Sequence, residues 1–119
     1  MNHHVPLTTK ELGDAGEEHA AQHLVAHGLK VLARNFRVKG GEIDIVCRES
    51  AMVIFVEVRK RARSDFGGAA YSITPTKQKR LILAARHWLA RHGDCACRFD
   101  CVLIDNEKLE WVKDAFRLD

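Results

Sequence analysis

The sequence lacks several features that would place it in common classes of protein. It has no apolar run near the roughly 20 residues that a membrane-spanning helix needs, and its longest run, Ala51 to Val56, suits a buried strand. Its first residues lack the basic and apolar regions of a secretory signal, so we expect a cytoplasmic protein without a membrane partner. We also find no repeat or low-complexity segment in the 119 residues, and we expect one domain over residues 1–119.

The cysteines lack the paired two-residue spacing that builds zinc ribbons and fingers. The segment from His92 to Cys101 holds a histidine and three cysteines that could be zinc ligands, but no such pairs. Disulfides are not favoured in a cytosolic chain. Cys47 and Cys101 lie in apolar strand-like segments, where a free cysteine packs as a small hydrophobe. We therefore expect the cysteines to be structural.

A strong net charge is also absent. The net charge of +3 does not by itself indicate a protein that binds nucleic acid. The distribution of charge is more informative, because basic residues gather in the middle of the sequence and acidic ones near its C-terminus. The basic residues are Arg59, Lys60, Arg61, Arg63, Lys77, Lys79 and Arg80. They could steer an anionic polymer toward this region, or they could form a solvated edge that prevents aggregation.

The pattern of apolar residues predicts two helices and five strands in the order α-β-β-β-α-β-β. The first helix should start at a capping box, Thr8 to Glu11, and end near Gly28; the second should start at Thr74-Pro75 and end near His92. The strands are expected at about 30–37, 42–48, 52–59, 98–104 and 108–112, with a loop at 62–73 and a turn at 115–116. This order predicts an α/β (α+β) fold, a mixed sheet flanked by helices.

Two acidic residues, Asp44 and Glu57, are predicted to oppose each other across a hairpin. If Ser50-Ala51 is a two-residue turn, these two acids pair, whereas a three-residue loop would send them to opposite faces of the sheet. Side chains alternate between the faces of a strand. The faces that should meet hold Glu42, Asp44, Val46 and Arg48 on one strand, and Val53, Phe55, Glu57 and Arg59 on the other.

Like charges opposed on a sheet destabilise it, unless one is protonated or a cation lies between them. Oxygen ligands of this kind select Mg²⁺ or Mn²⁺. The alternative is an ordinary lattice of ion pairs, in which Arg48 and Arg59 neutralise the two acids.

Glu17 is a third candidate, because it shares a helix face with Ala20, Ala21 and Leu24 that should dock on the sheet. A carboxylate buried there needs a partner. The alternative is a solvated glutamate at the rim of the helix, favoured near the helix N-terminus. Gly16 is expected to let this helix approach the sheet closely.

Several motifs occur together in a characteristic order. They are Gly13-x-x-Gly16-Glu17-x-x-Ala20, Gly41-Glu42-Ile43-Asp44-Ile45, Phe55-Val56-Glu57-Val58-Arg59-x-Arg61, Phe66-Gly67-x-Ala69, Lys77 and Arg98-Phe99-Asp100. Over nearly the whole chain this pattern resembles the bacterial YraN-type family, whose function is largely unestablished. That family is similar in fold to archaeal Holliday-junction resolvases and other PD-(D/E)XK nucleases. The resemblance implies a restriction-endonuclease-like core with Asp44, Glu57 and Glu17 as the metal-binding acids.

The sequence departs from the nuclease motif at Arg59, where that motif has a lysine. Arginine can grip phosphate and stabilise charge, but it cannot lose a proton to act as a base. A metal ion could activate the attacking water instead, or Lys77 could reach the site. We therefore expect the catalytic group to comprise Glu17, Asp44, Glu57, Arg59 and Lys77.

Three functions remain open at this point. The first is a Mg²⁺-dependent endonuclease that hydrolyses phosphodiester bonds, in branched DNA for example, with DNA favoured over RNA. Its nucleic-acid contacts would come from Lys60, Arg61, Arg63, Lys77 and Arg80, and Tyr71 could stack on a base. The second is a non-catalytic nucleic-acid binder on the same fold. The third is a protein-interaction module that uses the basic edge, and a homodimer is compatible with all three.

Overall fold

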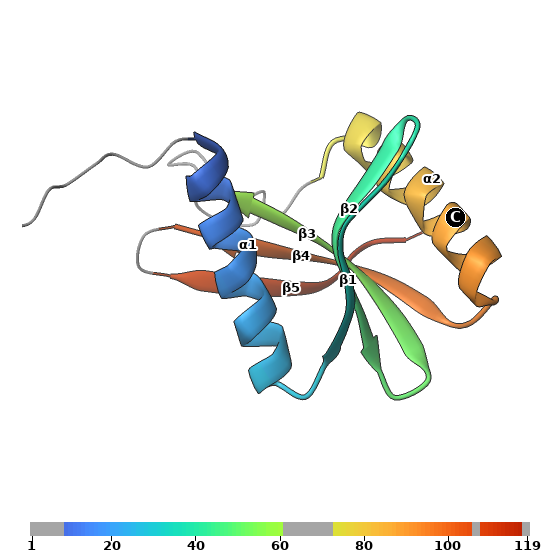
Figure 1. Ribbon diagram of the computed structural model, residues 1–119, viewed down its shortest axis with the longest axis horizontal. Helices are drawn as coiled ribbons and strands as arrows, with labels where there is room; N and C mark the ends of the chain where they lie inside the picture. Colours follow the sequence, from blue (N-terminus) through green and yellow to red (C-terminus); the bar gives the residue numbers. More distant parts are fainter. Residues whose placement is uncertain (1–8, 61–72, 106–107, 118–119) are drawn as a thin grey trace, which may run out of the picture.

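A five-stranded sheet with one helix on each face forms the protein (Figure 1). The computed structural model describes residues 9–60, 73–105 and 108–117, with side chains from residue 14 onward. The helices are α1 (Thr9–Ala26) and α2 (Pro75–His92). The strands are β1 (Lys30–Val38), β2 (Gly41–Glu49), β3 (Met52–Lys60), β4 (Cys97–Ile104) and β5 (Leu109–Phe116). The predicted fold class and element order are confirmed.

The sheet is mixed, and its strands follow one another in sequence order from β1 to β5. β3 and β4 pair in parallel, whereas the other neighbouring strands are antiparallel. The parallel pair requires a crossover, and α2 lies within that connection. β3 and β4 are both interior strands, which explains why each is apolar on its two faces.

Each helix covers its own hydrophobic core. On the α1 side, Ala20 and Leu24 pack against Ile45, Ile54 and Val102 of the sheet. On the α2 side, the core is larger and includes aromatic rings. Its buried members are Ile43, Val46, Val53, Phe55, Ile73, Leu81, Ala84, Ala85, Trp88, Phe99, Cys101 and Leu103. The buried residues of α2 itself, Leu81, Ala84, Ala85 and Trp88, recur at helical spacing and form one side of the helix.

The ends of both helices follow from local sequence. Thr74 Oγ1 accepts a hydrogen bond from the Lys77 backbone N–H at 3.3 Å, and Pro75 occupies the first turn of α2. Gly28 follows α1 with φ +92°, the left-handed conformation predicted for its stop. The capping box at Thr8 and the loop at 62–73 lie outside the described residues, apart from Ile73. In the part of the chain that is described, no helix has the length and apolar character required to span a membrane.

The last strand is longer than predicted, because β5 continues through Ala115 and Phe116 where a turn was expected. The strand includes an irregularity opposite Phe99 and Cys101, and Asp114 there has φ +56°. Phe116 stacks on Phe99 with ring centroids 4.6 Å apart. This contact with the core holds a segment whose sequence alone suggested a turn.

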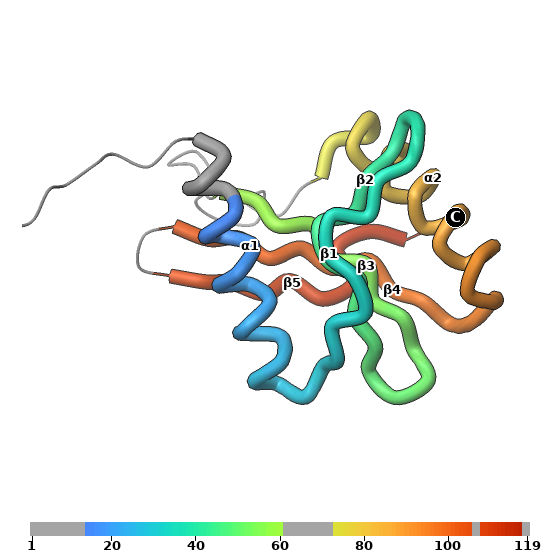
Figure 2. The backbone as a smooth tube through the Cα atoms, in the orientation of Figure 1, coloured from blue at the N-terminus to red at the C-terminus, as the bar shows by residue number. Residues whose placement is uncertain are grey.

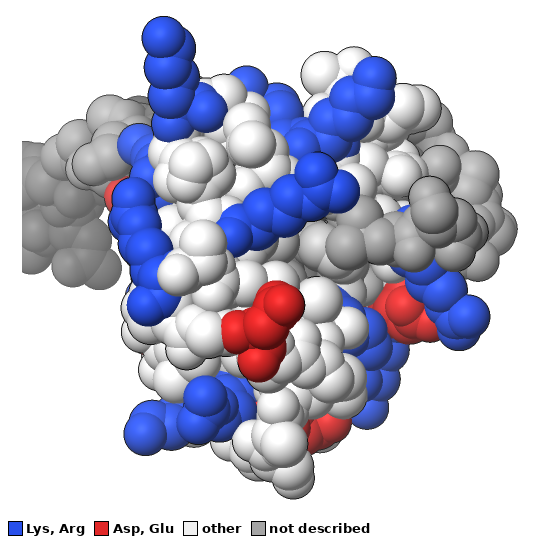
Figure 3. Space-filling model, turned by 90° about the vertical axis from the view of Figure 1, so that its right-hand side faces the viewer, with Lys and Arg blue, Asp and Glu red and all other residues white. Residues whose placement is uncertain are grey.

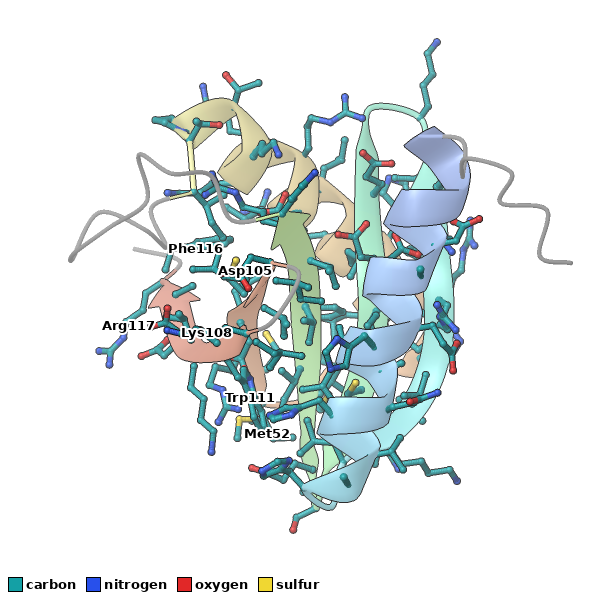
Figure 4. All side chains as sticks on the ribbon, turned by 90° about the vertical axis from the view of Figure 1, so that its left-hand side faces the viewer. Met52, Asp105, Lys108, Trp111, Phe116 and Arg117 are labelled. Atoms are coloured by element: carbon teal, nitrogen blue, oxygen red, sulfur yellow. The ribbon has the colours of Figure 1, made fainter. Side chains whose placement is uncertain are left out.

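A buried carboxylate fastens β5 to β4. Asp100 is 1% exposed, and Arg98 binds both of its oxygens at 2.7 and 2.8 Å. Trp111 Nε1, on β5 (Figure 4), and the Asp114 backbone N–H each donate to Asp100 at 2.9 Å. A buried charge is tolerated when its oxygens are hydrogen-bonded in this way. The Arg98-Phe99-Asp100 motif therefore has a structural role in this fold.

The β1–β2 hairpin curves over α2 (Figure 2). Gly41 permits this close approach, since a Cβ atom there would lie 2.5 Å from the Arg80 carbonyl oxygen and 3.1 Å from the Ala84 nitrogen. Gly16 differs, because a Cβ atom would meet nothing within 4 Å. The expectation that Gly16 lets α1 approach the sheet closely is therefore wrong.

We expect Gly41→Ala to lower the free energy of unfolding by about 1–3 kcal/mol, because the added methyl group must displace backbone atoms of α2. Gly16→Ala, the matched control, should raise it by about 0.5–1 kcal/mol through helix propensity. Urea denaturation of both variants measures the two effects. Equal stability of Gly41→Ala and the parent would contradict the close contact.

Candidate functional site

The β2–β3 hairpin has the register that brings Asp44 and Glu57 toward each other. Its turn is the two residues Ser50 and Ala51, and Ser50 has φ +53°. The pairs run from Glu49 with Met52 to Ile45 with Val56. The predicted register is confirmed over that range, and Asp44 and Glu57 are the next positions outward.

Asp44 lies where the two strands part. Its Oδ2 accepts a hydrogen bond from the Val58 backbone N–H at 2.8 Å, so a side chain of β2 replaces a backbone partner for β3. The regular alternation of faces also breaks here, because Ile43 packs in the α2-side core whereas Ile45 packs in the α1-side core. The regular alternation predicted along this strand is therefore wrong between Ile43 and Ile45.

The neighbouring strand bends at the same level. Asn35 of β1 lies between the residues that pair with Ile45 and Ile43, and it has φ +53°. Asparagine adopts this left-handed conformation more readily than most residues. The bend in both strands is consistent with the curvature of the hairpin toward α2, and it leaves the Asp44 carboxylate at the parting of β2 and β3.

Two glutamates reach the same region from different elements. Glu57 on β3 is 9% exposed, and Glu17 on α1 is partly buried. The Oε2 atom of each is buried and has no hydrogen-bond partner among the described residues. A buried carboxylate oxygen without a donor is energetically costly. The position of Glu17 therefore favours a role at the sheet over the solvated rim that we kept as an alternative.

Burial raises the pKa of Asp44 to about 7. The hydrogen bond from Val58 opposes this shift, while the negative charges of Glu17, Glu57 and Glu42 add to it. The carboxylates of Glu17 and Glu57 thus lie near enough to Asp44 to disfavour its ionised form. These three acids, which we call the acid cluster, are brought together by α1, β2 and β3.

Lys77 is a basic residue that contacts the acid cluster. Its Nζ atom lies 3.5 Å from Glu57 Oε1, although the lysine side chain is 53% exposed. The capped first turn of α2 places it there. The sequence had suggested Lys77 only as a residue that could reach the site, and the structure shows it in contact with one of the acids.

Cys101 lies beside Glu57 on the neighbouring strand, a placement that the sequence analysis did not predict. It pairs with Glu57 across β3 and β4 and is fully buried. The pKa of the Cys101 thiol is raised to about 12, mainly by burial; Glu57 and Asp44 contribute to the rise, and Arg59 and Lys77 oppose it. The charges of two acids and two bases of the candidate site, Arg59 among them, thus affect the pKa of this thiol. Predicting this placement would have required the parallel register between β3 and β4.

The other predicted contacts lie elsewhere or cannot be placed. Lys60 is exposed at the end of β3, and the Arg80 guanidinium lies 3.8 Å from Glu42 rather than beside Asp44 or Glu57. Arg61, Arg63 and Tyr71 lie outside the described residues. Lys77, which the ion-pair alternative with Arg48 and Arg59 did not include, pairs with Glu57.

The side chains of the acid cluster are oxygen donors. Within residues 14–60, 73–105 and 108–117, no three His, Cys, Asp or Glu side chains already form a ligand set for a metal ion. The donor chemistry nevertheless fits a hard divalent cation, because the candidate ligands are all carboxylates and two of their buried oxygens have no donor. A cation bound there would also offset the repulsion that raises the pKa of Asp44.

Comparison with known proteins places this arrangement in a family. Residues 16–104, which hold Glu17, Asp44, Glu57 and Lys77, match the model described as "Uncharacterised protein family UPF0102". The chain belongs to the UPF0102 family. A UPF0102 protein of Dechloromonas aromatica is 57% identical over 112 residues, which cover 94% of this chain and 93% of the relative. The UPF0102 protein YraN of Escherichia coli is 48% identical over 114 residues, covering 92% and 87% of the two chains.

A third UPF0102 relative, from Ralstonia pickettii, is 54% identical over 117 residues, covering 93% of this chain and 94% of the relative. The YraN-type resemblance is thus confirmed as membership of the UPF0102 family. These relatives support the family and carry no statement of activity. The roles of the site residues therefore stay predictions.

We expect the stability of the metal-free protein to fall as pH rises from about 4 to 7. The Asp44 carboxyl ionises near its ordinary pKa of 3.8 in the unfolded chain but near 7 in the folded protein, so the folded state binds more protons in this range. The Asp44→Asn variant keeps an oxygen for the Val58 N–H but cannot ionise. It should lose about 2–4 kcal/mol less than the parent across this range.

Chemical denaturation at a series of pH values, with EDTA present, measures this difference. The comparison depends on Asp44→Asn remaining folded, which circular dichroism checks. Parallel pH dependence in the parent and the variant would show that Asp44 is not held in its protonated form by the fold.

Proposed function

We propose that this protein is a divalent-metal-dependent nuclease that hydrolyses phosphodiester bonds in DNA. The observation that carries the proposal is the acid cluster, in which two buried carboxylate oxygens have no donor and the pKa of Asp44 is raised to about 7. Groups with strongly perturbed pKa values often mark functional sites. Such a cluster is costly in an apoprotein, and a cation would offset that cost.

Asp44 and Glu57 would hold the metal ion, and Glu17 would complete the set from α1. Mg²⁺ or Mn²⁺ bound there would supply Lewis-acid stabilisation of phosphate charge and a bound water of lowered pKa. The burial of Asp44 and Glu57 keeps their electrostatic attraction for a cation strong, because water screens it less. The Val58 N–H fixes the orientation of Asp44.

Lys77 would perform the task of the lysine that is missing from β3. Its ammonium group contacts Glu57, so it can orient a water molecule or stabilise charge on the phosphate undergoing attack. Arg59, two residues after Glu57 on β3, would grip a phosphate oxygen, a role that suits its fixed charge. The two bases thus divide positioning and charge stabilisation between them.

A non-catalytic nucleic-acid binder is the second candidate. It is favoured by Arg59 at the lysine position of the nuclease motif and by the lack of a ready ligand set in the described part of the chain. Such a protein would bind nucleic acid with steep salt dependence. It would not cleave with any divalent ion.

The proposal predicts cleavage of end-labelled DNA by the purified protein with Mg²⁺ or Mn²⁺ and none with EDTA. Branched, duplex and single-stranded substrates should be compared. Asp44→Asn and Glu57→Gln should each lower the rate by about 10²–10³-fold, because each removes a ligand of the metal ion that would stabilise charge on the reacting phosphate. Metal binding measured by calorimetry should weaken in parallel.

Glu17→Gln and Glu18→Gln form a matched pair, since the two acids are neighbours on α1. Glu18 is exposed and pairs with Arg34, so its replacement should leave cleavage unchanged, whereas Glu17→Gln should reduce it. Metal-independent products, or equal products from Asp44→Asn and the parent, would reject the nuclease. DNA binding without cleavage under all metals would establish the second candidate.

Lys77→Met should lower kcat by about 10²-fold, because it removes the positive charge that contacts Glu57. Lys108→Met, an exposed lysine beside β5 (Figure 4), is the control and should be neutral. Single-turnover rates with enzyme in excess separate this effect from DNA affinity. A Lys77→Met rate equal to that of the parent would remove Lys77 from the catalytic group.

A further inference from the structure

Helix α2 carries many positive charges and no acid. Its sequence contains Lys77, Lys79, Arg80, Arg86 and Arg91, with neither Asp nor Glu in its 18 residues. Clusters of one sign of charge raise the local concentration of an opposite polymer. The face of the molecule that α2 covers carries Lys and Arg more than Asp and Glu (Figure 3). This helix is therefore a candidate interaction surface.

The cations on the outward side of α2 form a row. The buried side of the helix is Leu81, Ala84, Ala85 and Trp88, and the opposite side is exposed. Lys79 and Arg86 lie near the centre of the exposed side, with Leu83 and Ala90, and Arg91 lies at its flank. We call Lys79, Arg86 and Arg91 the α2 stripe. Arg80 is left out, because Glu42 lies 3.8 Å from it.

The stripe extends away from the acid cluster. Lys77, in the first turn of α2, contacts Glu57, and the stripe starts half a turn later. At 1.5 Å per residue, Lys79 and Arg91 are about 18 Å apart along the helix axis. A DNA strand advances about 3.4 Å per nucleotide along its axis, so the stripe matches about five base-pair steps. Half a turn separates Lys77 from Lys79, so the stripe faces away from the side of α2 that contacts Glu57, and the two surfaces adjoin only at the start of the helix.

The residue types of the stripe favour one kind of nucleic acid over the others as its ligand. Sites for single strands add exposed aromatic side chains on which bases stack, but every aromatic ring of Phe, Tyr or Trp in the described residues is buried or partly buried. Recognition of duplex RNA uses 2′-hydroxyl contacts as well as phosphates. The three residues of the stripe are cations, and the exposed His87, four residues from both Leu83 and Arg91, is the hydrogen-bonding side chain between them. Phosphate contact alone suits duplex DNA.

We propose that the α2 stripe binds the phosphate backbone of duplex DNA. This inference rests on the proposed function in one respect, namely that nucleic acid is the ligand. It adds the duplex as the substrate class and a binding surface outside the acid cluster. The stripe contacts carry no sequence preference, because they reach phosphates and not bases.

The test compares two variants that lose the same charge. Lys79→Gln/Arg86→Gln/Arg91→Gln removes the stripe, and Lys30→Gln/Lys108→Gln/Lys113→Gln removes three exposed lysines outside α2. Fluorescence anisotropy with a labelled, blunt-ended DNA duplex, in EDTA and over a series of salt concentrations, gives the dependence of log K on log[salt]. The single strand and an RNA duplex of the same sequence are the comparison ligands.

We expect the stripe variant to lose about 2–3 units from the slope for duplex DNA, since each lost phosphate contact removes about 0.9. The control should lose less than about one unit. Equal loss in both variants, or tighter binding of the single strand or the RNA duplex than of duplex DNA, would overturn the inference. Thermal unfolding of both variants checks that they are folded.

Cleavage separates this inference from the proposed nuclease. If the parent binds duplex DNA through the stripe but never cleaves it, the proposed nuclease function is rejected and the proposed duplex binding by the stripe is supported. If the parent cleaves duplex DNA and the stripe variant cleaves it with unchanged kcat/KM at physiological salt, the stripe fails and the nuclease stands.

Discussion

The hydrogen bond from the Val58 N–H to Asp44 is the interaction on which the candidate site depends. In a continuous antiparallel pair, backbone groups would satisfy one another and both carboxylates would stand on one face of a flat hairpin. Here the Asp44 carboxylate is the acceptor for the Val58 N–H where β2 and β3 separate, and it stays partly buried while its strand bends toward α2. Glu17 of α1 and Glu57 of β3 thus lie near Asp44, whose orientation is fixed by this hydrogen bond.

Much of the fold could be predicted because it follows local rules. Alternation of apolar residues and a two-residue turn fixed the register of the β2–β3 hairpin, since a one-residue slip would expose the core. Threonine and proline marked the start of α2, and Gly28 the end of α1. These signals act within a few residues of one another and are therefore visible in sequence.

The features that could not be predicted depend on contacts between distant segments. The break in alternation at Asp44 results from a side chain that bonds to the backbone of another strand. The extension of β5 through Phe116 is held by Phe99 and by the donors that Asp100 receives. Cys101 enters the site through a parallel register that only the assembled sheet defines. No local pattern encodes such pairings, which is also why Gly16 was misread while Gly41 is the glycine at a close contact.

The close contact at Gly41 has a mechanical consequence. Gly41 lies three residues before Asp44 on β2, and the Arg80 carbonyl that it touches lies three residues after Lys77 on α2. This backbone contact therefore links the strand that carries Asp44 to the helix that carries Lys77. Because the backbones of α2 and β2 already lie this close, α2 cannot move toward β2 without displacing the strand that carries Asp44.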